Sequence, residues 1–171
     1  MSPEEQITQR QNLPDFLRNR NLLVRLVIGI FVVLVLITFF VLINGSDIIN
    51  PPKAVLGERS FTVAIADDPK ERMKGLSGKE KFNNDRGMLF IFDKPDYYSF
   101  WMRDMKFPLD IIFIKENKIV KIYHNVQAPK NQEGLSIYQT PIPSDRVLEI
   151  NAGLSKEYGF KEGQEIEFKN I

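Results

Sequence analysis

The stretch "YYSFWMRDMKFPLDIIFI", residues 97–114, decides the fold of this chain. Its last part, "LDIIFI" (109–114), carries apolar side chains at both alternating positions, so both faces of the predicted strand are apolar. Such a strand is typical of the centre of a sheet that is covered on both sides. Asp110 shares one of these faces, where a carboxylate is costly unless it is hydrogen-bonded or paired. Its candidate partners are Arg72, Arg103 and backbone N–H groups of loops, and the pattern leaves open whether Asp110 braces the fold or does chemistry.

Six further segments alternate in polarity or are rich in β-branched and aromatic residues between turn signals, which predicts strands. They are residues 60–67, 87–92, 98–102, 119–126, 147–152 and 164–168. "KENK" (115–118) predicts a tight turn between the two strands beside it. No long helices alternate with the strands. The fold class is therefore mainly β: a compact antiparallel β-sandwich or barrel with two short helices.

The two short helices are predicted from their end signals. Asp68 suits an N-cap, Pro69 the first helical position and Glu71 the third position of a capping box, with the end expected at Gly75 or Gly78. The second helical segment is "LSKEYGF" (154–160), in which a glycine near the end favours termination.

Composition excludes several classes of function. Lys and Arg total 23 against 22 acidic residues, a balance that gives no reason to expect a nucleic-acid partner. The chain has no cysteine and one histidine, His124, so disulfides, thiolate chemistry and multi-histidine metal sites are excluded. No phosphate-binding loop, dinucleotide fingerprint or G-x-S-x-G motif occurs. We therefore expect no metal site and no cofactor.

Residues 22–43 form an apolar run long enough for a membrane-spanning helix preceding the β-rich part. A helix of this length spans roughly 33 Å, against a bilayer core of about 30 Å. Four arginines precede or enter the run (10, 18, 20 and 25), which predicts a cytoplasmic N-terminus and a cell-membrane location with the C-terminal part outside. The run exceeds a signal-peptide core and has no clear cleavage site, so a retained anchor in the lipid bilayer is expected.

This gives four predicted parts: a cytoplasmic tail (1–21), the membrane helix (22–43), a linker (44–57) and an extracytoplasmic β-rich domain (58–171). The prediction of a linker rests on two pairs of residues. Asn44-Gly45 favours a turn, and Pro51-Pro52 favours a stiff, extended chain.

Candidate site residues concentrate near the opening stretch. Trp101 and Arg103 share one face, where the guanidinium could stack on the ring, line a groove or lie as a rim charge over a core aromatic. The long segment 127–146 is rich in proline, and Tyr138 could dock it over the sheet. We expect any pocket to lie between this loop and the turn from Trp101 to Asp110.

Four motifs together carry a family resemblance: "RMKGLSG" (72–78), "RGMLFIF" (86–92), "FWMRDMKFPLDIIFI" (100–114) and "VLEINAGLSKEYGFKEGQEIEF" (147–168). They resemble the DUF192 (UPF0127) family. The resemblance implies a compact β-rich domain, often exported or membrane-anchored, with no established general activity. The positions of this sequence that match the family pattern are Arg72, Gly75, Leu76, Gly87, Met88, Phe100, Trp101, Met102, Pro108, Leu109, Asp110, Glu149 and Gly153. In the family, "FWM" is commonly followed by a basic residue and then by Asn-Thr. This sequence keeps the basic residue as Arg103, but Asp104-Met105 replaces Asn-Thr.

These observations predict a binding or interaction module at the cell envelope, with an unknown envelope ligand or protein as partner. The alternative is an acid/base hydrolase that uses Asp110 with Asp104 or Glu149, and it requires acids that converge in an open cleft. A third hypothesis is a structural partner that pairs through its helix, although no G-x-x-x-G motif specifies pairing. The candidate binding-site residues are Arg72, Trp101, Arg103, Asp104, Asp110, Tyr138 and Glu149.

Overall fold

The computed structural model describes residues 20–130 and 134–171, with the backbone alone at 20, 21 and 44–49. The chain divides into two compact units at the Ile49–Asn50 bond. The first unit contains helix α3 (Arg20–Ile49), and its apolar segment Leu22–Ile43 is long and apolar enough to cross a membrane, a property that a signal sequence shares. The predicted tail 1–21 lies almost entirely outside the described residues.

The predicted linker is shorter than the sequence suggested. Helix α3 continues to Ile49, and the first strand, β1 (Lys53–Leu56), already belongs to the second unit. Ala54 and Leu56 are buried, so the short "KAVL" segment is part of the core. Pro51-Pro52 thus precedes a strand and does not mark the middle of a linker.

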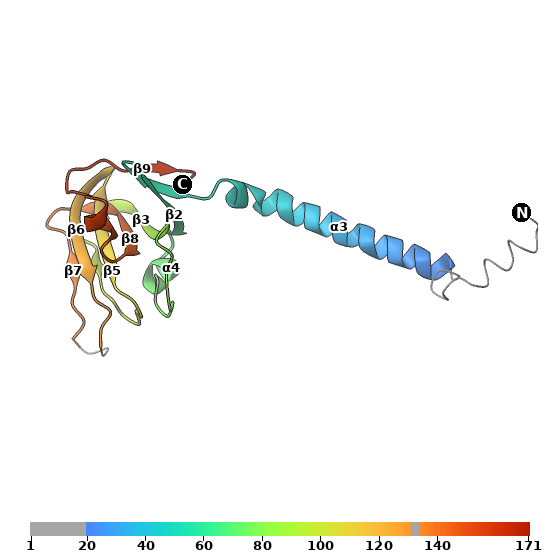
Figure 1. Cartoon of the computed structure of the whole chain (residues 1–171), viewed down its shortest axis with the longest axis horizontal. Helices are drawn as coiled ribbons and strands as arrows, with labels where there is room; N and C mark the ends of the chain where they lie inside the picture. The colour runs from blue at the N-terminus through green and yellow to red at the C-terminus, as the bar shows by residue number, and fades with distance from the viewer. Residues whose placement is uncertain (1–19, 131–133) are drawn as a thin grey trace, which may run out of the picture. The chain divides into compact units, whose positions relative to one another are not determined.

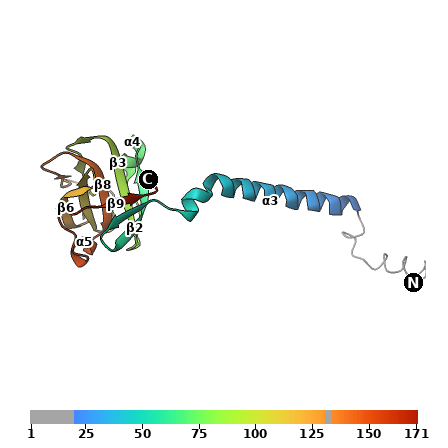
Figure 2. The same cartoon turned by 90° about the horizontal axis from the view of Figure 1, so that it is seen from above.

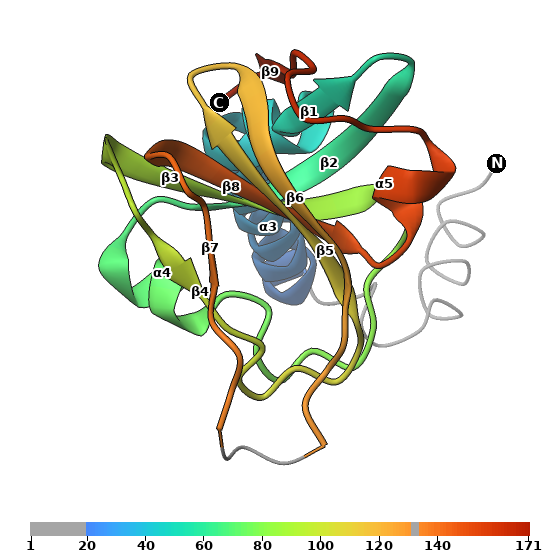
Figure 3. The ribbon, with the colours of Figure 1, turned by 90° about the vertical axis from the view of Figure 1, so that its left-hand side faces the viewer.

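The second unit is a seven-stranded curled sheet with a small two-stranded sheet packed on it, seen in Figures 1 and 3. The order in the large sheet is β6-β5-β8-β3-β2-β1-β9. Its remaining strands are β2 (Arg59–Ala66), β3 (Arg86–Asp96), β5 (Leu109–Lys115), β6 (Lys118–Val126), β8 (Ser144–Asn151) and β9 (Glu167–Lys169), and the small sheet pairs β4 (Ser99–Phe100) with β7 (Tyr138–Gln139). The mainly β prediction is confirmed, and β1 and β7 are strands that it missed.

One pair of strands departs from the antiparallel expectation. β2 and β3 are parallel neighbours, joined by a connection that contains helix α4 (Pro69–Lys74). A parallel pair needs such a crossover, because the chain must return to the same end of the sheet. The end signals of α4 are confirmed: the Asp68 side chain accepts a hydrogen bond from the Glu71 N–H at 2.8 Å, and the helix stops at Gly75 with φ 49°.

The two edges of the large sheet nearly meet. β9 pairs with β1 at one edge, while the residues just before β9 bond to the start of β6 and the turn that precedes it: Ile119 N–H donates to Gln164 O at 2.9 Å, and Ile166 N–H donates to Asn117 O at 2.9 Å. Figure 2 shows β9 and the C-terminus beside the first strands of the domain. This near-closure leaves little unpaired edge on the sheet.

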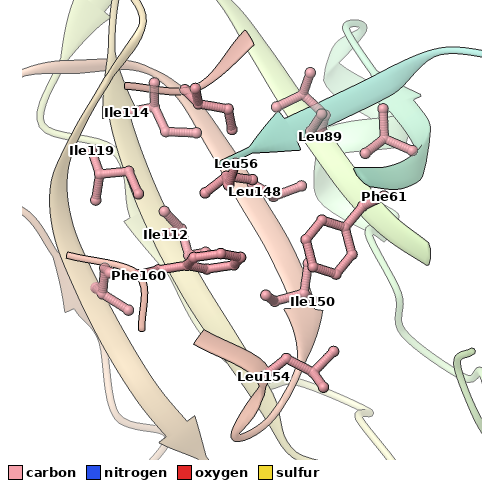
Figure 4. Close-up of a cluster of buried hydrophobic side chains, with 14 residues drawn as sticks. Leu56, Phe61, Leu89, Ile112, Ile114, Ile119, Leu148, Ile150, Leu154 and Phe160 are labelled. Atoms are coloured by element: carbon pink, nitrogen blue, oxygen red, sulfur yellow. The ribbon is translucent and has the colours of Figure 1, made fainter. Parts of the chain in front are cut away.

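The inside of the curled sheet is filled by one cluster of buried apolar side chains (Figure 4). Every strand of the large sheet adds a side chain to it or packs against it, and helix α5 (Leu154–Glu157) with the following Phe160 covers one side. Phe61 and Phe160 meet edge to face with their centroids 6.2 Å apart.

A second cluster covers the outer face of the strands β3, β5 and β8. Figure 3 shows α4 and the β4–β7 pair on this side of the sheet and α5 on the other. β5 is consequently buried on both faces, as its sequence predicted: Phe113 lies in the outer cluster and Ile112 in the inner one. The outer cluster is the layer in which the candidate site lies.

Candidate functional site

Glu149 is a buried acid in the middle of the outer layer. It lies on β8, opposite Met88 of β3 and Ile111 of β5, and its side chain therefore points away from the inner cluster. Only 5% of the residue is exposed, and no described residue donates a hydrogen bond to its carboxyl or forms an ion pair with it. Burial raises the pKa of the Glu149 carboxyl to about 8. The group is consequently mostly protonated at pH 7.

The Glu149 cavity is a space of about 210 Å³ that is walled by α4, β3, β4, β8 and the loop after β4. Its wall is mostly apolar, and the residues with charged side chains are Arg72, Lys74 and Glu149. Five aromatic residues form much of it: Phe90, Phe92, Tyr98, Phe100 and Trp101. An apolar cavity with few polar groups is the usual form of a small-molecule site.

The aromatic wall is held by ring contacts. Phe90 meets Phe100 edge to face at 4.9 Å between centroids, and Phe92 stacks on Tyr98 at 3.5 Å. The Tyr98 hydroxyl donates to Lys94 O at 2.8 Å, and burial together with the nearby Asp96 charge raises the pKa of Tyr98. These contacts join the aromatic side chains of the wall to one another and to the backbone of β3.

Arg72 is anchored to the backbone at the cavity wall. Its Nη1 donates to Ile91 O at 2.8 Å and also to Asp67 O, and its guanidinium lies 5.2 Å from the centroid of Phe92. Within the described residues, no acidic side chain forms an ion pair with Arg72. The cation is therefore positioned by neutral groups and keeps its charge available to the cavity.

Asp110 has a different environment, in the inner layer. It is fully buried, and its two carboxylate oxygens accept four hydrogen bonds. Oδ1 accepts from Asn125 N–H at 2.6 Å and Gly153 N–H at 3.1 Å, and Oδ2 accepts from the N–H and hydroxyl of Ser155 at 2.8 and 2.6 Å. Asp110 thus joins the end of β6 to the start of α5. The backbone partners expected from the sequence are found, and neither Arg72 nor Arg103 pairs with it.

The acids proposed for a hydrolase do not converge. Asp110 lies opposite Ile150 on β8, and Glu149 is the next residue along that strand, so the two carboxyls point to opposite faces of one sheet. Asp104 is exposed in the loop after β4, where its carbonyl accepts from Gly78 N–H, and it does not line the Glu149 cavity. The open cleft with paired acids that this hypothesis requires is absent from the described residues.

The remaining predicted site residues separate into two places. Trp101 is 42% exposed and lines the Glu149 cavity, while the Arg103 guanidinium lies over its ring, 5.2 Å from the centroid, and does not line the cavity. Tyr138 packs against Tyr123 at 5.2 Å between centroids and lines the second depression described below, not the Glu149 cavity. Arg72, Trp101 and Glu149 are therefore the three predicted site residues that the structure brings together.

A second, more open depression lies where the sequence predicted a pocket. It has a volume of about 500 Å³ and is lined by Met102, Tyr138, His124 and residues of the loop after β6. His124 Nδ1 lies 2.7 Å from Ser155 Oγ, which connects this depression to Asp110. Ser155 itself is fully buried, so its hydroxyl is not exposed for attack on a substrate.

The sequence did not single out Phe90, Phe92, Tyr98 or Lys74 as site residues. The alternation in "GMLFIF" places Phe90 and Phe92 on one face, which is a usable signal, but nothing local shows that this face meets Glu149. Among the described residues no group of three or more His, Asp or Glu side chains could hold a metal ion.

Comparison with known proteins assigns the family. The DUF192 profile, described as "Uncharacterized ACR", matches residues 53–168. The chain belongs to the DUF192 family. Six of the residues that carry the resemblance line the Glu149 cavity, namely Arg72, Gly75, Leu76, Phe100, Trp101 and Glu149.

Two solved structures are similar to this DUF192 chain. A protein of unknown function from Novosphingobium aromaticivorans is 32% identical with a TM-score of 0.62, over 69% of this chain and 84% of that one. A protein from Sinorhizobium meliloti described as a proposed transcription regulator is 30% identical with a TM-score of 0.61, over 70% and 92%. No curated protein shows a significant match.

Proposed function

We propose that this DUF192 domain is a binding module for a small molecule with an apolar body, held outside the cell membrane by the helix at Leu22–Ile43. The observation that carries the proposal is Glu149, a residue that is only 5% exposed, has no hydrogen-bond partner for its carboxyl among the described residues, and lines an aromatic cavity. A buried polar group without a partner is costly. A ligand that hydrogen-bonds to it would offset that cost.

The size of the cavity limits the ligand. An apolar protein cavity of about 150 Å³ holds one benzene molecule, and the Glu149 cavity measures about 210 Å³. It therefore has room for one ring, or a chain of similar volume, with one small polar group. A polymer of the cell envelope could insert only one such unit.

Trp101 is the only tryptophan in the chain and lines the cavity, so its fluorescence reports binding directly. We expect phenylacetamide, a neutral single-ring probe, to shift the emission of the full chain in detergent micelles to shorter wavelength in a saturable way. The reason is that the probe replaces water beside a ring that is 42% exposed.

Two matched variants test whether the cavity is responsible. Ser99 lines the Glu149 cavity and Ser136 lines the second depression. We expect Ser99→Phe to weaken phenylacetamide binding about tenfold or more by filling the cavity, and Ser136→Phe to leave it unchanged. No saturable shift in the wild type, or equal binding by Ser99→Phe, would reject the cavity as the site.

The membrane arrangement is open to a separate test, because the chain has no cysteine. Lys156 is exposed on α5. In intact cells that produce the full chain, Lys156→Cys should react with a membrane-impermeant maleimide, and Ser2→Cys should react only after lysis. The opposite pattern contradicts the proposed orientation, and a mature fragment that begins near residue 45 contradicts a retained anchor.

A further inference from the structure

The charged side chains that line the Glu149 cavity do not cancel, and the acids Asp93 and Asp96, which act on Tyr98, lie outside its wall. The charged side chains in its wall are Arg72 and Lys74 from α4 and Glu149 from β8, and the other titratable group is Tyr98. The strands that flank Glu149 present Met88 and Ile111 beside it, neither of which titrates. With Glu149 protonated, the wall carries net positive charge at neutral pH.

The wall also contains hydrogen-bond donors without a protein partner. Among the described residues, Arg72 donates through Nη1 alone, to Ile91 O and Asp67 O, and its remaining N–H groups have no partner. A protonated Glu149 adds one O–H donor. The complementary group on a ligand is therefore an acceptor with negative charge, because a carboxylate can take two N–H bonds from one guanidinium.

We infer that the Glu149 cavity binds a small apolar monocarboxylate, with the carboxylate near Arg72 and the ring or short chain against the aromatic wall. This inference rests on the proposed function and specifies its ligand class. Arg72 is suited to the task because backbone carbonyls hold one of its nitrogens and Phe92 supports its plane, so little side-chain freedom remains to be lost on binding.

Glu149 makes such binding dependent on pH. An anionic ligand next to an ionised Glu149 would suffer like-charge repulsion, so the bound state requires the protonated acid. Above pH 8 binding must then take up one proton, and affinity falls about tenfold for each further pH unit. A cationic amine would show the opposite trend, since it binds best to the ionised acid and gains affinity as the pH rises toward 8.

Three probes of one shape separate these cases: phenylacetate, phenylacetamide and phenethylamine, titrated into the full chain in detergent micelles with Trp101 emission as the signal. At pH 7 we expect phenylacetate to bind about tenfold more tightly than phenylacetamide, and phenethylamine to bind most weakly. At pH 9 phenylacetate should lose about tenfold, while phenylacetamide should change far less.

Two variants assign the effects to residues. Glu149→Gln should bind phenylacetate equally at pH 7 and pH 9, because the amide does not ionise. Arg72→Gln should lower phenylacetate affinity to that of phenylacetamide, and retained phenylacetamide binding shows that the variant is folded. If phenylacetamide or phenethylamine binds as well as phenylacetate, the inference fails while the proposed function stands. If none of the three binds, both fail.

Discussion

Replacing Glu149 with glutamine is expected to make the domain more stable at pH 8 and to change its stability little at pH 4. In the folded protein, burial raises the pKa of Glu149 from 4.5 to about 8. The folded state thus binds its proton more tightly than the unfolded state does. Between these two pH values only the unfolded chain loses the proton, and stability falls as the pH rises.

The size of this effect follows from the shift. Each pKa unit corresponds to about 1.4 kcal/mol, so a shift of this size corresponds to roughly 4–5 kcal/mol of destabilisation once the pH reaches 8. A glutamine carries no charge to bury, so Glu149→Gln should remove this pH dependence. The measurement is urea unfolding of the fragment 50–171, which contains both apolar clusters, at several pH values from 4 to 9.

Glu58 provides the matched control, because it is exposed in the turn between β1 and β2. Glu58→Gln should leave the pH profile of stability as it is in the wild type. If Glu149→Gln instead destabilises the fragment equally at every pH, the carboxyl makes a specific bond in the folded state. The unpartnered acid on which the proposed site depends would then be excluded.

Local patterns in the sequence were sufficient for seven of the nine described strands and for the burial of β5 on both faces. The alternation from Leu109 to Ile114 needs no knowledge of the neighbours, since the pleat alone assigns each side chain to a face. The same holds for α4, whose cap and end are encoded within eight residues, Asp68 to Gly75. These parts are local, and they were predicted correctly.

The pairing of the strands could not be predicted from patterns within single segments of the sequence. That β2 and β3 are parallel depends on the direction of a crossover, and β1 and β7 are too short to show a period. The site depends on pairing in the same way. Only the register of β5 with β8, which places Asp110 opposite Ile150, shows that Asp110 and Glu149 face opposite sides of the sheet. The hydrolase hypothesis grouped these acids because the sequence alone does not show how β5 and β8 are aligned in the sheet.

Asp110→Asn is expected to destabilise the domain strongly, because four donors converge on the native carboxylate. Asparagine offers one oxygen and one NH₂ group. If the NH₂ replaces Oδ1, it faces the N–H groups of Asn125 and Gly153, and if it replaces Oδ2, it faces the N–H of Ser155. In either orientation at least one buried backbone donor loses its acceptor.

We expect the free energy of unfolding of the fragment 50–171 to fall by about 3–5 kcal/mol, since bonds to a buried charge are worth roughly 1.5–3 kcal/mol each. This is a large share of the roughly 5–15 kcal/mol that stabilises a typical domain. Ser155→Ala should cost less, because the backbone N–H of Ser155 still reaches Oδ2 and only the hydroxyl bonds to Asp110 and His124 are lost.

The exposed Asp93 on β3 is the comparison, and Asp93→Asn should change the urea midpoint little. An Asp110→Asn variant that is as stable as the wild type, or more stable, would show that the carboxylate is strained in the folded state. Strain of that kind is expected at a functional acid and not at an acid that only stabilises the fold. The expected large loss instead assigns Asp110 to the fold, because a residue whose oxygens are occupied by four protein donors has no lone pair directed at a ligand.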